Sequence, residues 1–142
     1  MDAFVKRYGP WALVAGASEG IGAAFAKELA RRGLNLVLVA RRLEPLEAAA
    51  REIDGVAKVQ VRCIPLDLAR ADAAAALEKE LADLDIGLVV YNAALAPAGE
   101  FLEIPLAEQL AAIDVNTRGP LEMAHRFGKR MAARGSGGIV LL

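Results

Sequence analysis

Val14-Ala15-Gly16-Ala17-Ser18-Glu19-Gly20-Ile21-Gly22 is the stretch that decides the fold of this chain. It follows a short apolar run, 11–15, and precedes a run with helical periodicity that begins near Gly20. Glycine adopts positive φ at little cost and lets another backbone or a ligand come close. A helix that begins here points unpaired N–H groups and a partial positive charge forward, which suits a phosphate. The stretch therefore predicts a strand, a tight turn and a helix around a phosphate site.

The spacing of these glycines is weak support for that site when taken alone. Glycines stand at 16, 20 and 22, which gives Gly-x-x-x-Gly-x-Gly rather than the dinucleotide fingerprint Gly-x-Gly-x-x-Gly. The alternative is an ordinary tight turn. The strand expected before the glycines and the helix expected after them favour the phosphate site.

Length, composition and charge limit the classes of protein. The 142 residues suffice for one domain with a hydrophobic core, and 56% of them are hydrophobic. A net charge of −1 predicts no nucleic-acid partner, and no apolar run is long enough to predict a membrane span. The single cysteine, Cys63, is interpreted as a small buried side chain and favours a reducing, cytoplasmic location. No cluster of cysteine, histidine and carboxylate residues predicts a metal site.

Apolar and amphipathic runs alternate along the chain. The apolar runs predict strands at 11–15, 34–40, 56–64, 86–91 and 139–142, the third nearer an edge because it alternates more clearly. After a lead-in at 1–10, the amphipathic runs predict helices from 20 to about 32, at 43–53 and at 69–84. Two further helical segments are predicted from 105 to about 134, joined or bent near Gly119-Pro120. This order predicts a Rossmann-type α/β fold over residues 1–142. We expect a doubly wound parallel sheet in three α/β/α layers, truncated after the fifth strand.

Polar side chains follow the predicted strands directly. Arg41, Asp67 and Asn92 come after the second, third and fourth strands, as the glycine turn comes after the first. The carboxyl ends of parallel strands share one edge of the sheet, and ligands bind there where the strand order reverses. We therefore expect these residues to line one nucleotide site.

The residues after the second strand indicate which nucleotide binds. An NAD site places a carboxylate there for the ribose hydroxyls, whereas this chain has Arg41-Arg42, whose guanidinium groups suit a 2′-phosphate. Ser18 offers a further donor, while the carboxylate of Glu19 disfavours a phosphate. NADP(H) is therefore favoured over NAD(H). The alternatives are that both arginines cap the next helix or face solvent, and that Asp67 caps a helix instead of accepting from adenine.

Taken together, these motifs resemble the N-terminal, cofactor-binding portion of a classical short-chain dehydrogenase/reductase. The resemblance rests on Gly16 to Gly22, Asp67-Leu68, Asn92-Ala93-Ala94 and Val115-Asn116-Thr117-Arg118-Gly119, in the family's order. It implies an NADP(H)-binding domain and hydride transfer between the cofactor and a small-molecule carbonyl or alcohol substrate. The cofactor-binding residues that it implies are Gly16, Ser18, Glu19, Gly20, Ile21, Gly22, Arg41, Arg42, Asp67, Leu68, Asn92, Ala93 and Ala94.

The chain also departs from the family's pattern. Ala15 and Ala94 stand where threonine and glycine are common. Asn116 is the only member of the family's catalytic tetrad present, because the serine and the Tyr-x-x-x-Lys pattern follow the fifth strand. The family role of Asn116 is to hold a water linked to the lysine. The alternative, which the sequence alone favours, is an asparagine at a helix bend that satisfies a local backbone group. We expect the chain alone, without the C-terminal catalytic portion, to be inactive.

Two functions stay open at this point. The chain is either an N-terminal fragment of an NADP-dependent oxidoreductase of this type or a non-catalytic nucleotide-binding or subunit-pairing module. The apolar segment 139–142 favours the fragment, because natural proteins cover an apolar strand edge. The helix expected at 121–134 is similar to the family's pairing helix, which implies a homo-oligomer.

Overall fold

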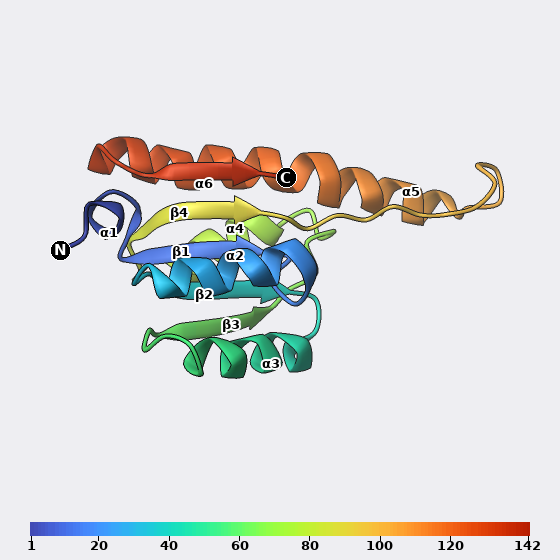
Figure 1. Ribbon diagram of the computed structural model, residues 1–142. Coiled ribbons are helices and arrows are strands. Elements are labelled where there is room, and N and C mark those ends of the chain that lie inside the picture. Colours follow the sequence, from blue (N-terminus) through green and yellow to red (C-terminus); the bar gives the residue numbers. More distant parts are fainter.

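The computed structural model describes residues 1–142 as a five-stranded parallel sheet between two layers of helices (Figure 1). The strand order is β3-β2-β1-β4-β5, so the chain builds one half of the sheet outward from β1 and then returns to build the other half. This is the predicted Rossmann-type, three-layer α/β/α fold. The strands are β1 (Trp11–Ala15), β2 (Asn35–Ala40), β3 (Val61–Pro65), β4 (Ile86–Tyr91) and β5 (Gly138–Leu141).

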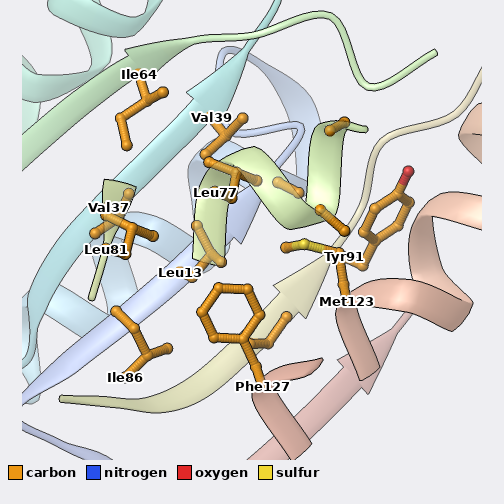
Figure 2. Close-up of a cluster of buried hydrophobic side chains, with 14 of the residues drawn as sticks. Leu13, Val37, Val39, Ile64, Leu77, Leu81, Ile86, Tyr91, Met123 and Phe127 are labelled. Atoms are coloured by element: carbon orange, nitrogen blue, oxygen red, sulfur yellow. The ribbon is translucent and has the colours of Figure 1, made fainter. Parts of the chain in front are cut away.

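The hydrophobic core lies on both faces of the sheet. Helices α2 (Gly20–Arg31) and α3 (Leu43–Asp54) cover one face, and α4 (Ala73–Glu80) and α6 (Gly119–Arg134) cover the other. Every residue of β4 is buried, which explains why this strand is an unbroken apolar run. Figure 2 shows the cluster beneath α4 and α6, in which Leu13, Leu77 and Phe127 are fully buried.

The third strand is shorter than predicted. The sequence predicts a strand over 56–64, whereas β3 begins only at Val61. Its sole partner, β2, begins at Asn35, so the preceding residues have no strand to pair with. The side-chain oxygen of Asn35 instead accepts the N–H of Gln60 at 2.9 Å, where the ladder begins. The prediction that this strand lies at an edge of the sheet is confirmed.

The predicted helix at 69–84 is confined to α4. Before it, Asp67 accepts the N–H of Ala69 at 2.9 Å in a turn that delays the helix. After it, the chain tightens into turns, and the guanidinium group of Arg130 donates to the carbonyls of Leu81 and Leu84. The length of α4 is therefore set by side-chain bonds at both ends rather than by its alanine-rich composition.

The predicted lead-in at 1–10 contains a short helix, α1 (Ala3–Tyr8). The side chain of Asp2 caps this helix by accepting the N–H of Phe4 at 3.0 Å. Phe4, Val5 and Tyr8 pack against the core cluster on the α2 and α3 side of the sheet. This apolar contact supplies the stability that a six-residue helix lacks by itself.

A long helical path follows β4. It consists of α5 (Leu106–Ile113), the π-helical turn η1 (Asp114–Arg118) and α6, so the two predicted helical segments are joined by η1, which ends immediately before Gly119-Pro120. Helix α5 extends beyond the carboxyl ends of the strands (Figure 1) and buries none of its residues, whereas α6 buries Met123, Phe127 and Met131. None of the helices combines the length and the apolar composition needed to cross a bilayer.

Candidate functional site

A cavity of about 730 Å³ lies at the carboxyl edge of the sheet, where β1 and β4 lead the chain in opposite directions. Such a switch point is where open α/β sheets bind ligands. The turn or loop after each of the first four strands contributes to its wall. The lining residues are Gly16, Ser18, Glu19, Ala40, Arg41, Leu66, Asp67, Leu68, Ala69, Asn92, Ala93, Ala94, Leu95, Pro97, Glu108, Ala111 and Val115.

The glycine turn after β1 is in direct backbone contact with the loop after β4. Gly16 has φ +80°, and a Cβ atom there would lie 2.6 Å from the backbone nitrogen of Ala93. A Cβ atom on Gly22 would lie 1.9 Å from the carbonyl oxygen of Gly16 and 2.9 Å from Nδ2 of Asn92. These two positions admit only glycine because the backbones already touch. The glycines thus hold the turn, the start of α2 and the β4 loop in one rigid unit.

The start of α2 is open toward solvent. Glu19 precedes the helix, but its side chain makes no capping hydrogen bond. Gly20 and Ile21 are exposed in the first helical turn and do not line the cavity, nor does the buried Gly22. The N–H groups of this turn and the positive end of the helix dipole are therefore available to an anion.

The residues after β2 and β3 form the far wall of the cavity. Arg41 is exposed, lines the cavity and has no carboxylate within ion-pairing distance. Asp67 and Leu68 line the same wall, and Asp67 also caps the turn that follows it. Arg42 is exposed at the start of α3 and lies outside the lining. Only Arg41 of the two arginines is thus placed to meet a ligand in the cavity.

The loop after β4 closes the other side. The backbone N–H of Asn92 donates to the carbonyl of Ala15 at 2.8 Å, and its side-chain amide donates to the carbonyl of Gly16 at 3.3 Å. Three residues further on, Leu95 pairs with the side chain of Asn116: Oδ1 of Asn116 accepts the Leu95 N–H at 2.9 Å, and Nδ2 donates to the Leu95 carbonyl at 2.7 Å.

Asn116 lies on η1, beside the lining residue Val115, and does not itself line the cavity. Its side chain satisfies a backbone group, as the sequence favoured, but that group belongs to Leu95 rather than to a neighbour in the helix. The distance of 21 residues in sequence is what kept this partner from being predicted. A catalytic role for Asn116 stays a prediction.

Tyr91 is a residue whose importance the sequence did not reveal. It is the last residue of β4 and is only 2% exposed, and its hydroxyl donates to the carbonyl of Val115 at 2.5 Å. Figure 2 shows its ring at the margin of the core cluster, with the hydroxyl pointing away from the other labelled side chains. Burial raises the pKa of Tyr91 to about 12. The available signal was a tyrosine ending an apolar strand, because a buried hydroxyl needs a partner.

Other reactive side chains do not gather at the cavity. His125 is exposed on α6. Cys63 on β3 is partly exposed rather than buried as predicted, since β3 is an edge strand, and burial, with a smaller contribution from Glu47, raises the pKa of its thiol. No group of three or more histidine, cysteine, aspartate or glutamate side chains is arranged to hold a metal ion.

Known proteins resemble this chain over nearly its whole length. Residues 10–142 match the family model of the short chain dehydrogenases. A 7beta-hydroxysteroid dehydrogenase of Clostridium sardiniense is 36% identical over 139 residues, which cover 98% of this chain and 53% of that protein. A solved 7beta-hydroxysteroid dehydrogenase structure superposes with a TM-score of 0.92 at 32% identity, over 97% of this chain and 55% of that one.

A second solved structure is a short-chain dehydrogenase from Sphingobium yanoikuyae in complex with NADPH. It superposes with a TM-score of 0.86 at 36% identity, over 94% of this chain and 52% of that one. The chain therefore spans about half the length of the relatives that it matches.

The close contact at Gly22 predicts that Gly22→Ala destabilises the chain. The added Cβ overlaps the carbonyl of Gly16, and relieving this overlap must displace backbone. We expect the free energy of unfolding, measured by urea denaturation, to fall by about 3 kcal/mol. The matched control is Gly55→Ala, where φ is −70° and the nearest atom lies 3.4 Å away, so a change below about 1 kcal/mol is expected. Equal stability of the two variants would contradict this account of the turn.

The raised pKa of Tyr91 predicts a loss of stability at alkaline pH. Below pH 10 the hydroxyl is protonated in both the folded and the unfolded state, so it contributes no pH dependence. Between about pH 10 and 12 the unfolded state releases this proton while the folded state keeps it, which favours unfolding by about 2–3 kcal/mol. Urea denaturation across this range should show a steeper decline for the native chain than for Tyr91→Phe. Parallel declines would show that Tyr91 is not the titrating group.

Proposed function

This chain belongs to the short-chain dehydrogenase family, and we propose that it supplies the cofactor-binding half of an oxidoreductase that transfers hydride between NADP(H) and a carbonyl or alcohol. One observation carries the proposal: the glycine turn, Arg41, Asp67 and Asn92 line one cavity at the switch point of the sheet. Residues from four separate loops meet there, which an ordinary tight turn after β1 would not require.

The chemistry of the cavity wall fits a dinucleotide phosphate. The open start of α2 suits the pyrophosphate, and the unpaired guanidinium group of Arg41 suits a 2′-phosphate. Asp67 and Leu68 would flank adenine, and Asn92, Ala93 and Ala94 would support the nicotinamide half. NADP(H) supplies or accepts the hydride when bound, and the residues of this chain bind and orient it.

The preference for NADP(H) over NAD(H) rests on charge. No carboxylate follows β2, where an NAD site needs one, and Arg41 occupies the wall instead. The relative from Sphingobium yanoikuyae, whose structure contains NADPH, supports the same choice. Glu19 also lines the cavity, and its negative charge weakens the preference for NADP(H), but this exposed carboxylate is free to turn toward solvent.

The complete reaction needs a proton donor that these residues do not include. Reduction of a carbonyl requires an acid for the developing alkoxide. Neither of the two tyrosines has a lysine four residues later, as the family pattern requires. We propose that this chain alone binds the cofactor without turning over substrate. The absence of a proton donor also fits the alternative function, a non-catalytic nucleotide-binding or subunit-pairing module.

The proposed substrate is a small molecule with a bulky apolar framework that carries the carbonyl or hydroxyl group. Apolar side chains from the β4 loop and the helical path above it, Leu95, Pro97, Ala111 and Val115, line the upper wall. The hydroxysteroid dehydrogenases among the relatives support this class. A cytoplasmic location is part of the same proposal and rests on the single, unpaired cysteine.

We also propose that the chain forms a homo-oligomer. The resemblance implies pairing through the helix at 121–134, and we propose that α5, which precedes that helix, extends the same contact. Leu106, Leu110 and Ile113 recur at helical spacing and are 70%, 51% and 57% exposed. An exposed apolar stripe of this kind marks an interaction surface, and a second copy offers the same stripe in return.

The first prediction from this proposal concerns cofactor binding. Calorimetric titration should show tighter binding of NADPH than of NADH to the native chain. Arg41→Ala should raise the dissociation constant for NADPH by about tenfold or more and leave that for NADH nearly unchanged, because only NADPH carries the 2′-phosphate. Arg51→Ala, an exposed arginine at the other end of α3, is the matched control and should bind as the native chain does. A native chain that binds neither nucleotide would refute the proposed function.

The second prediction concerns assembly. Leu110→Asp places a charge in the middle of the α5 stripe and should convert the oligomer to a monomer in sedimentation velocity. Val56→Asp is the control, since this exposed apolar residue lies in the loop after α3, away from α5. A native chain that sediments as a monomer at all concentrations would exclude the proposed interface.

A further inference from the structure

The π-helical turn η1 leaves one backbone carbonyl without a donor from its own helix. The N–H of Gly119 donates to Asp114, five residues earlier, instead of to Val115, four residues earlier. In the same π pattern the carbonyl of Val115 would accept from the N–H of residue 120. That residue is Pro120, which has no N–H. Val115 is buried, so water does not readily replace the missing donor.

Tyr91 supplies the donor from outside the helix. Its hydroxyl lies 2.5 Å from the Val115 carbonyl. A tyrosine hydroxyl is protonated throughout the physiological range, since its ordinary pKa is about 10, so it is available as a donor. Burial raises the pKa of Tyr91 further, to about 12. Gly119 makes room for it, since a Cβ atom at that position would lie 2.3 Å from the hydroxyl oxygen. The strand residue and the turn are thus fitted to each other at both Val115 and Gly119.

The consequence of this contact reaches the cavity. Asn116 follows Val115 on η1 and pairs through both atoms of its side-chain amide with the backbone of Leu95. Leu95 lies in the loop that begins immediately after Tyr91, and it lines the cavity together with Asn92, Ala93 and Ala94. The segment 92–95 is therefore fixed to η1 on both sides, by the bond of Tyr91, which precedes it, and by the Asn116 pair at Leu95.

We infer that Tyr91 is a positioning residue of the cofactor site: its hydroxyl replaces the donor that Pro120 lacks, holds η1 in its π-helical form, and so keeps Asn116 against the loop that lines the cavity. This inference rests on the proposed function for its link to the cofactor. The structural part, the dependence of the Asn116–Leu95 pair on Tyr91, stands on the contacts alone.

A double-mutant cycle tests the inference. Tyr91→Phe keeps the ring and removes the donor, and Pro120→Ala restores an N–H that can serve Val115. We expect Tyr91→Phe to lower the melting temperature by about 5 °C. In the Pro120→Ala background, Tyr91→Phe should lower the melting temperature by less than half as much, because the new N–H replaces the hydroxyl. Equal losses in the two backgrounds would overturn the inference.

Two further readouts separate positioning from general stability. Hydrogen exchange of the Leu95 N–H reports the Asn116 pair without any cofactor, and Tyr91→Phe should accelerate it about tenfold. The dissociation constant for NADPH should rise about fivefold. Phe127→Leu is the control, because Phe127 is fully buried in the same core cluster but forms no bond to η1. The two variants are compared at equal loss of melting temperature. If Phe127→Leu then accelerates hydrogen exchange of the Leu95 N–H as much as Tyr91→Phe does, the inference is wrong.

The outcomes distinguish this inference from the proposed function. A native chain that binds no NADPH refutes the proposed function, and the cycle and the Leu95 exchange then decide the role of Tyr91 alone. If Tyr91→Phe fails to fold and the double variant folds, the inference is supported in its strongest form. If neither folds, it is overturned, because the restored N–H does not replace the hydroxyl.

Discussion

The backbone contact between the glycine turn and the β4 loop is the constraint on which the rest of this structure depends. At Gly16 there is no space for even one carbon atom, since main-chain atoms of Asn92 and Ala93 in the β4 loop fill the position, and at Gly22 the carbonyl group of Gly16 fills it. This contact joins the two halves of the sheet at the point where the strand order reverses. The cavity forms there because the chain leaves β1 and β4 in opposite directions while their ends stay locked together.

The walls of the cavity are consequently held by main-chain and buried contacts rather than by surface ion pairs. Asn92 ties its loop to the glycine turn, Tyr91 ties the strand end to η1, and Asn116 returns to the loop. By contrast, the ion pairs Arg32–Glu28, Lys58–Asp54 and Arg70–Asp72 join exposed side chains, where each contributes little. This division suits a site in which a rigid scaffold presents a few exposed groups, such as Arg41, to a flexible dinucleotide.

Much of the fold follows from local patterns, and the remainder depends on partners distant in sequence. The strands β1, β2 and β4 are apolar runs because helices cover both their faces, and such runs are visible in the sequence. The start of β3 was not predictable because β2 sets it, and the ends of α4 were not predictable because Asp67 and Arg130 set them. The cavity edge was predicted from residues that follow strands, and nine of the expected residues line it: Gly16, Ser18, Glu19, Arg41, Asp67, Leu68, Asn92, Ala93 and Ala94. Their roles toward a cofactor stay predictions. The partners of Tyr91 and Asn116 lie 24 and 21 residues away, beyond the reach of any local pattern.

The turn η1 also acts as a phase shift between the two helices that it joins. A π-helical turn accommodates one additional residue within a helical path, and one residue corresponds to a rotation of about 100° about the helix axis. The apolar side of α6 faces the sheet, while α5 extends beyond the strands and buries none of its residues. An insertion or deletion of one residue within 114–118 would therefore change the length of the helical path only slightly, but it would rotate α5 about the helix axis relative to α6. A single-codon event at this turn would redirect an entire surface of the molecule and leave the core beneath α6 in place.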